Sequence, residues 1–366
     1  MKIPYINLSY KNKSKIELVN IFKKILESGS FVGGQEIKTF EKKIASFCGT
    51  KYAVALNSGT DALTFALHLC DLKKGDEVIT PPNSFIASTS VIVHLGAKPV
   101  FVDVLEDQNI DPAKIEKAIT KKTKVIMPVH LSGRICQMDK IIKIAKKYNI
   151  KIIEDAAQSI GSKFKKKRSG SFGYIGCFSA HPLKNLSAIG DSGFLTTNNL
   201  NVYKKVKSLC NHGMENRKII KNFGYVSRMD NLQAAFLNYK LKNLNKIIKL
   251  RRKNAKIYHK NLDKKFIKLP VENKNEFNTY HTFVIQVSKR DRLKNYLLKK
   301  GIQTAIHYPV PIHLQPAAKK FGYKKGDFKN TELQSKKILT LPVNENLNKN
   351  HIMNICKKIN DFYKNN

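Results

Sequence analysis

Residues 52–69, YAVALNSGTDALTFALHL, decide the fold. Tyr52–Leu56 has the length and apolar character of a buried strand, and Asp61–Leu69 carries apolar residues at helical spacing. Asn57–Thr60 lies between them and leads from one to the other. The stretch therefore predicts a strand–turn–helix unit.

The turn in this unit has two interpretations. A helix N-terminus offers unpaired N–H groups and a partial positive charge, which suit a phosphate group. Gly59 would let that group approach the backbone closely. An ordinary turn capped by Ser58 or Thr60 would have the same sequence, so both interpretations stay open at this point.

Short apolar segments alternate with helical ones along the first two thirds of the chain. Strands are expected at Glu77–Thr80, Pro99–Val102, Lys124–Pro128 and Ile150–Glu154, with helical segments between them. This alternation predicts a mainly parallel sheet with helices on both faces and with ligands at the carboxyl ends of its strands.

The later part of the chain changes character. A long charged helix is expected over Asp230–Tyr258, and strand-like Phe283–Val287 follows it. A chain of 366 residues is long enough for two domains. We predict an α/β protein with a large domain of residues 1–249 and a smaller C-terminal α/β domain of residues 250–366. The N-terminal segment is counted with the large domain, with packing on the smaller domain as the alternative.

The composition argues against several classes of function. The net charge is +40, but only eight of the 67 basic residues are Arg, and the Lys residues are spread along the chain. Recognition of bases and phosphates favours clustered Arg, so we expect no nucleic-acid partner.

The six Cys residues lack metal-ligand spacing, so no metal site is expected. Residues 1–13 do not resemble a signal peptide, and no apolar run approaches roughly 20 residues, so we expect a cytoplasmic protein that does not bind membranes.

Two further segments carry side chains suited to cofactor chemistry. Asp155 follows an apolar strand, and an acid there can pair with a protonated pyridine nitrogen and strengthen the ring as an electron sink. Gln158, three residues later, can hydrogen-bond a ring substituent. A helix N-cap is the other interpretation of Asp155. Lys184 lies in a loop after a short strand, and a nucleophilic Lys needs a lowered pKa and shelter from bulk water. On composition alone, an exposed Lys is the simpler interpretation.

These segments together resemble the DegT/DnrJ/StrS family of sugar aminotransferases, which use pyridoxal 5′-phosphate (PLP). The family has the aspartate-aminotransferase fold, fold type I, with a mainly parallel seven-stranded sheet. The resemblance covers nearly the whole chain. It rests on the order and spacing of NSGTDAL (57–63), EDAAQS (154–159), FSAHPLKN (178–185), GDSG (190–193) and RMDNLQAA (228–235).

The resemblance implies a role for each matching residue. Lys184 would hold PLP as a Schiff base and move the proton during catalysis. Asp155 would pair with the pyridine nitrogen and Gln158 with the phenolic oxygen, while Phe85 would stack on the ring. The phosphate would bind Ser58, Gly59, Thr60 and Ser179.

One position departs from the family pattern. The family often has Asn where this chain has Val226, and that Asn reaches the phosphate in the neighbouring subunit of a homodimer. Val226 cannot donate a side-chain hydrogen bond. Asn231, Arg228 or a backbone N–H would take its place, or the site has one contact fewer. We assign Asn231 to the cofactor site.

The activity implied by the resemblance is transfer of an amino group, with L-glutamate as donor and pyridoxamine phosphate (PMP) as the intermediate form of the cofactor. Dehydratases of this family replace the Schiff-base Lys by His, so Lys184 favours amination. The acceptor would be a nucleotide-linked keto-deoxysugar for amino-sugar biosynthesis, as in lipopolysaccharide. The HPLKN form of the Lys motif leaves a free keto sugar acid, such as an oxidised 3-deoxyoctulosonate, as the alternative. A non-catalytic PLP-fold regulator is the rival class.

The acceptor side of the site is expected to include five residues. His181 either lines the acceptor pocket or simply packs, and both interpretations stay open. The full set is His181, Asn185, His307, Tyr308 and His313.

Overall fold

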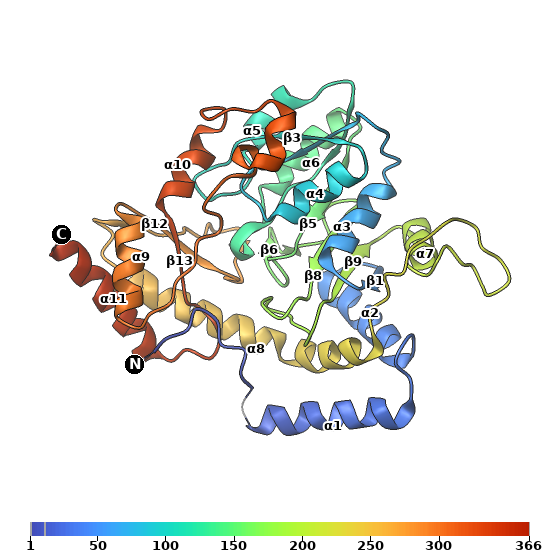
Figure 1. Cartoon of the computed structure of the whole chain (residues 1–366), viewed down its shortest axis with the longest axis horizontal. Coiled ribbons are helices and arrows are strands. Elements are labelled where there is room, and N and C mark those ends of the chain that lie inside the picture. The colour runs from blue at the N-terminus through green and yellow to red at the C-terminus, as the bar shows by residue number, and fades with distance from the viewer. Residues whose placement is uncertain (1, 11, 366) are drawn as a thin grey trace.

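The computed structural model describes residues 2–10 and 12–365, and Figure 1 shows two α/β units joined by one long helix. The larger unit is built on a seven-stranded sheet with the strand order β1-β9-β8-β5-β4-β2-β3. Strand β9 pairs antiparallel with β1 and β8, and the other pairs are parallel. The predicted mainly parallel seven-stranded sheet is therefore confirmed. The strands are β1 (Tyr52–Leu56), β2 (Glu77–Thr80), β3 (Lys98–Phe101), β4 (Thr123–Ile126), β5 (Lys151–Asp155), β8 (Ile175–Ser179) and β9 (Gly193–Thr197).

Both faces of this sheet are covered, as strand β1 illustrates. Val54 and Leu56 point to the face where Leu63 packs, whereas Ala53 packs on the opposite face with Phe40. Successive side chains of a strand point to opposite faces, so an apolar run such as YAVAL is buried on both. The covering helices are α2 (Gln35–Cys48), α3 (Gly59–His68), α4 (Ile86–His94), α5 (Pro112–Ile115), α6 (Met138–Lys147) and α7 (Leu200–Leu209), with the 3₁₀ helices η1 (Glu116–Ala118) and η2 (Leu131–Gly133).

The smaller unit has a three-stranded antiparallel sheet of order β10-β12-β13. Ile3 of the N-terminal segment is buried in its core and forms a parallel bridge with Ile302. The N-terminal segment thus packs on the smaller unit. The elements of the unit are β10 (Ile267–Lys268), β12 (Phe283–Val287), α9 (Arg290–Lys299), β13 (Ile338–Leu341) and α11 (Lys349–Lys364).

Helix α8 (Asn231–Asn261) crosses from one core to the other. Leu244 and Ile248 pack in the core of the larger unit, whereas Ala255 and Tyr258 pack in the core of the smaller one. The proposed boundary after residue 249 falls between these two pairs.

The segment that precedes β13 packs back on the larger unit. Ile312 and Phe328 contact Phe101 at the edge of the seven-stranded sheet, and Asn330 donates a backbone hydrogen bond to Asp103 Oδ2 at 3.0 Å. This part of the proposed smaller C-terminal domain therefore packs on the larger unit. The segment contains η3 (Ile312–Leu314), η4 (Pro316–Phe321) and α10 (Lys329–Lys337).

The remaining elements lie at the periphery. Helix α1 (Asn12–Ser28) runs beside α8 in Figure 1. A short sheet of β6 (Lys163–Phe164), β7 (Lys167–Arg168) and β11 (Glu276–Phe277) links the two units. Within residues 2–10 and 12–365, none of the helices is both long and apolar enough to cross a bilayer.

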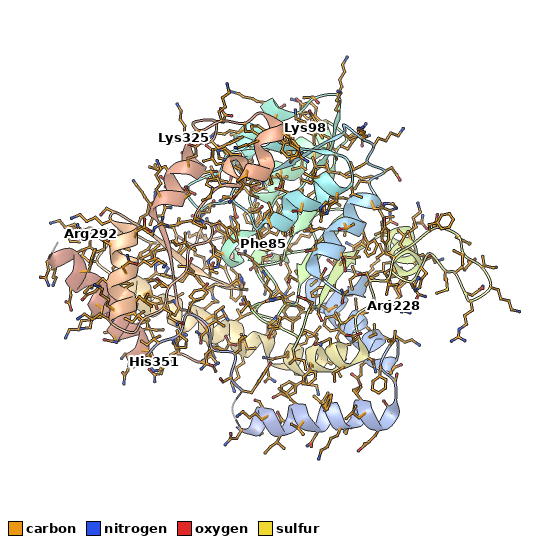
Figure 2. The ribbon with its side chains drawn as sticks, in the orientation of Figure 1. Phe85, Lys98, Arg228, Arg292, Lys325 and His351 are labelled. Atoms are coloured by element: carbon orange, nitrogen blue, oxygen red, sulfur yellow. The ribbon has the colours of Figure 1, made fainter. Side chains whose placement is uncertain are left out.

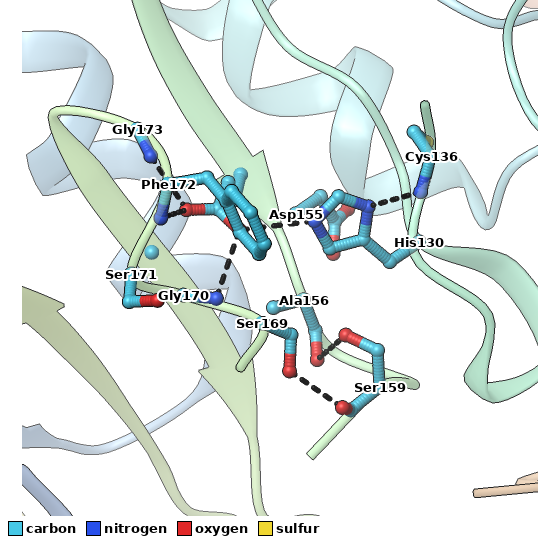
Figure 3. A network of polar contacts seen from close by, with 12 residues as sticks. His130, Cys136, Asp155, Ala156, Ser159, Ser169, Gly170, Ser171, Phe172 and Gly173 are labelled. Carbon is cyan, nitrogen blue, oxygen red and sulfur yellow. Dashed lines mark hydrogen bonds and ion pairs between the residues drawn. The ribbon is translucent and has the colours of Figure 1, made fainter. Parts of the chain in front are cut away.

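A buried polar network fixes the carboxyl end of β5 (Figure 3). Glu154, with 0% exposure, accepts hydrogen bonds from the N–H groups of Phe172 and Gly173 at 2.7 Å and of Gly170 at 2.8 Å. His130 Nε2 lies 3.0 Å from Glu154 Oε2. Because His130 Nδ1 accepts from the backbone N–H of Cys136, Nε2 carries the ring proton and donates it to the carboxylate. Four donors therefore hold the residue that precedes Asp155.

We expect Glu154→Gln to lower the free energy of unfolding by about 2–4 kcal/mol, since the new amide would direct an N–H toward donors. Urea unfolding of the apoprotein measures the change. Glu106→Gln is the matched control, because the Glu106 side chain is 83% exposed and pairs only with Lys268 at the surface, so its loss should cost below about 1 kcal/mol. Equal effects of the two substitutions would contradict this account of the network.

Candidate active site

A cavity of about 440 Å³ lies at the carboxyl ends of β1, β5 and β8, where a parallel sheet is expected to bind its ligand. It gathers residues from four separate sequence motifs. The predicted site residues that line it are Ser58, Gly59, Thr60, Phe85, Asp155, Gln158, Ser179, His181, Lys184, His307 and Tyr308.

Asp155 ends strand β5 and is nearly fully buried. Its Oδ2 accepts a hydrogen bond from Ser88 Oγ at 2.7 Å, and its Oδ1 accepts one from the N–H of Ala157 at 3.2 Å. No helix begins here, so the alternative interpretation of Asp155 as a helix N-cap is wrong. Its carboxylate is oriented for a partner in the cavity.

Lys184 is partly buried in the loop after β8. Burial lowers the pKa of its amine, and the nearby Asp155 carboxylate partly offsets this by raising it. The simple interpretation of an exposed surface Lys is therefore wrong. A larger neutral fraction at a given pH makes the amine a better nucleophile than a solvated Lys.

The N-terminus of α3 forms one wall of the cavity. Ser58 is the N-cap, and its Oγ accepts a hydrogen bond from the N–H of Asp61 at 3.0 Å. Gly59 approaches the end of β8 so closely that an added Cβ would lie 2.7 Å from Ser179 Cβ. The cap and the close approach occur together, so the two interpretations of this turn are compatible. Free N–H groups at this end suit a phosphate.

Tyr308 contacts both Phe85 and Gln158 in the cavity. Phe85 is largely exposed just before α4, near the centre of the molecule in Figure 2. Its ring centroid lies 6.1 Å from that of Tyr308. Gln158 Oε1 accepts from the N–H of Ser132 at 2.8 Å, which directs Nε2 toward Tyr308 Oη at 3.3 Å. Burial raises the pKa of Tyr308 to about 12, so the phenol stays neutral.

Two histidines face Lys184. Burial, reinforced by Lys184, lowers the pKa of His307 to about 4 and that of His281 well below its usual value. Both rings are therefore neutral near pH 7. His307 Nδ1 lies 3.0 Å from Thr340 Oγ1, which fixes the orientation of its ring.

Three predicted site residues lie outside this cavity. His313, with 2% exposure, is 3.1 Å from Glu332 Oε1, so its ring is buried against that carboxylate and does not face the cavity. Asn185 is buried, with its Oδ1 3.4 Å from His281 Nδ1, so it reaches the site only through that ring. Asn231 is buried and donates to the carbonyl of Ser30 at 2.8 Å, so its amide is already engaged within this chain.

Sequence reasoning missed Ser88, His281 and the role of Tyr5, all of which line the cavity. Ser88 lies in the first turn of α4, three residues after Phe85, but Phe85 is the extended residue that precedes the helix, so no helical spacing in the sequence links the two. His281 stands in no motif, and only the folding of the smaller unit against the larger brings it near Lys184.

These residues fit PLP. Phe85 offers an aromatic face, Asp155 an anion for the ring nitrogen, α3 a phosphate-binding N-terminus, and Lys184 an amine for the aldehyde. In the described part of the chain, no group of three or more His, Cys, Asp or Glu side chains could hold a metal ion.

Comparison with known sequences agrees with this fit. The profile of the DegT/DnrJ/EryC1/StrS aminotransferase family matches residues 12–360. The "pleiotropic regulatory protein" of Geobacillus stearothermophilus is 36% identical, over 100% of this chain and 99% of the relative. The dTDP-3-amino-3,6-dideoxy-alpha-D-galactopyranose transaminase of Aneurinibacillus thermoaerophilus is 38% identical, over 98% of this chain and 99% of the relative.

Solved structures give the same result. DesV of S. venezuelae, in complex with a ketimine intermediate, is 33% identical and superposes with a TM-score of 0.96 over 99% of this chain and 98% of its own. The PLP form of the sugar aminotransferase Spr1654 of Streptococcus pneumoniae is 27% identical, with a TM-score of 0.92 over 100% of this chain and 99% of its own, and a PMP form is also known. The chain therefore belongs to the DegT/DnrJ/EryC1/StrS family of aminotransferases, whose cofactor is PLP.

Proposed function

We propose that this aminotransferase moves an amino group from L-glutamate to a nucleotide-linked keto-deoxysugar, with Lys184 as the residue that holds the cofactor. The observation that carries the proposal is the convergence of Lys184, Asp155 and the N-terminus of α3 on one cavity. The relative named as a dTDP-sugar transaminase supports the acceptor class. The product would serve amino-sugar biosynthesis.

Asp155 and Lys184 have separate roles in the proposed reaction. Bound PLP supplies the electron sink for bond breaking at the donor α-carbon. Asp155, held by Ser88 and Ala157, would pair with the ring nitrogen and keep it protonated. Lys184 Nζ takes the proton from the donor α-carbon and returns it, since its lowered pKa leaves a larger neutral fraction than a solvated Lys would have.

The remaining lining residues set the environment of that amine. The neutral rings of His281 and His307 add no positive charge beside Lys184. The neutral phenol of Tyr308, which accepts from Gln158, keeps a proton that it can donate to the phenolic oxygen of the cofactor or to an acceptor.

A homodimer is part of the proposal. The segment that follows α7 projects from the body of the molecule in Figure 1. It carries Ile220, Tyr225, Val226 and a fully exposed Phe223. Apolar side chains on a projecting loop favour burial against a second copy. Val226 would then contribute apolar area rather than a phosphate contact. Arg228, labelled beside this segment in Figure 2, donates to Asn211 Oδ1 at 3.0 Å.

Two alternatives are weighed against the proposal. The regulatory name of one relative favours a non-catalytic role, but a buried amine and a positioned carboxylate are what turnover requires. A free keto sugar acid as acceptor follows from the unusual HPLKN motif. An acceptor panel of dTDP-linked and UDP-linked keto sugars and an oxidised 3-deoxyoctulosonate separates the acceptors, and turnover of only the free acid would overturn the nucleotide-linked assignment.

We expect Lys184→Ala to slow the response of the PLP-loaded protein to L-glutamate by about 10²–10⁴-fold, because the proton-transferring amine is lost. The change in visible absorbance measures this response in single turnover. Lys242→Ala is the control, since this exposed Lys lies on α8 outside the active-site cavity. A Lys184→Ala response at the wild-type rate would refute the role of Lys184. A wild type that binds PLP but ignores L-glutamate would refute the donor.

The capture of PLP by the apoprotein should rise with pH and level off with a midpoint below 10.5, the ordinary pKa of Lys, because only the neutral amine attacks the aldehyde. Asp155→Asn removes a charge that raises the pKa of Lys184, so its midpoint should move still lower. Stopped-flow absorbance measures both midpoints. A wild-type midpoint at or above 10.5, or an upward shift in Asp155→Asn, would contradict the electrostatic account.

A further inference from the structure

A second cavity, of about 210 Å³, adjoins the active site. Ile6, Leu183 and Lys184 line both cavities, so the second begins where the first ends. Its other walls come from the N-terminal segment up to Tyr10, from helix α8 and from the loop Asn344–Asn346. A molecule that reaches Lys184 can therefore extend into this space.

The walls of the second cavity carry cations and hydrogen-bonding groups. Besides Lys184, its charged residues are Lys240, Lys246 and Arg251, against one carboxylate, Glu345. Its other polar side chains include amides and hydroxyls, namely Asn7, Ser9, Ser14, Ser187, Asn243, Asn344 and Asn346. Such a lining suits an anionic ligand that accepts many hydrogen bonds.

Arg251 and Glu345 are already committed to each other. Arg251 Nη2 lies 2.9 Å from Glu345 Oε2, and Nε donates to the same oxygen at 3.1 Å. Arg251 Nη1 donates to the carbonyl of His281 at 3.1 Å. This ion pair neutralises the Glu345 carboxylate. Arg251 therefore lines the cavity, but its guanidinium is already engaged by protein groups.

Lys240 and Lys246 are the two other cations of this cavity besides Lys184 and Arg251, and Lys240 is the more buried of the two. Its Nζ lies 4.6 Å from the centre of the Tyr10 ring, and no carboxylate of the described residues forms an ion pair with it. Burial lowers the pKa of Lys240, which reflects the cost of desolvating its ammonium group. The Glu345 carboxylate partly offsets this cost by raising the pKa, whereas Arg251 lowers it further. A partly desolvated charge is unfavourable, and a bound anion would relieve that cost.

We propose that this second cavity binds the diphosphate of the nucleotide-linked acceptor, with Lys240 as the principal cation. The inference rests on the proposed function and deepens it, because it names the residues that would select a diphosphate. A volume of 210 Å³ is below the roughly 300 Å³ of typical small-molecule pockets, so the cavity holds the diphosphate and not the whole nucleotide. Because Lys184 lines both cavities, a sugar attached to a diphosphate held in the second cavity would extend into the active site.

Calorimetric titration of the PLP-loaded protein with UDP, dTDP and GDP tests the inference. We expect at least one of the three to bind, and Lys240→Gln to weaken that binding about tenfold or more, since a charge-assisted contact is lost. Lys240→Arg keeps the charge and should stay within about threefold of wild type. The matched control is Lys242→Gln, on the same helix but outside the cavity, which should bind as wild type does.

Two controls separate the possible failures. The corresponding nucleosides, which lack phosphate, should bind wild type and Lys240→Gln equally, and thermal unfolding verifies that Lys240→Gln is folded. A wild type that binds none of the diphosphates, or a Lys240→Gln protein that binds them as tightly as wild type, would overturn the inference. The response of wild type to L-glutamate is measured separately, so loss of that response counts against the proposed function and not against the diphosphate site.

Discussion

Burial of the Lys184 amine close to the Asp155 carboxylate is the constraint on which the rest of the structure depends. Burial favours the neutral amine, and the carboxylate limits how far that effect goes. Both groups stand in loops or at strand ends and not within rigid helices, so other elements must hold them. Most of the buried polar network around β5 and β8 serves to do so.

That support has two layers. Ser88 and Ala157 hold the Asp155 carboxylate directly. Behind it, Glu154 ties the end of β5 to the 170–173 loop through hydrogen bonds that leave its carboxylate fully satisfied. Removing water from these groups strengthens each electrostatic interaction among them. The cavity can therefore combine a reactive amine with a fixed anion near neutral pH.

The sequence predicted the elements with strong apolar patterns and missed those without them. Strands β2 and β12 have the predicted bounds, because apolar runs and flanking turns mark them clearly. Strand β9 was not predicted, since GFLTT is short and two of its five residues are polar-looking Thr that are nonetheless buried. Only pairing with β1 and β8 reveals it.

The site shows the same division between motif and tertiary context. Motif residues at strand ends and at a helix N-terminus were predicted, because parallel strands bring such positions together. His313 lies outside the cavity, beside Glu332, and its motif position carries no sign of that contact. Tyr5 and His281 reach the cavity through packing between units distant in sequence. The second cavity, with Lys240 in its wall, was likewise beyond the reach of the sequence.

The most direct measurement for the central claim is to reduce the PLP-loaded protein with borohydride, digest it and locate the pyridoxyl group by peptide mass spectrometry. Reduction fixes the cofactor on the amine that holds it, without any need for turnover. The account predicts modification of Lys184 alone among the 59 Lys residues of the chain (67 basic residues less eight Arg). Modification of another Lys, or a protein that binds PLP but carries no pyridoxyl group after reduction, would contradict it.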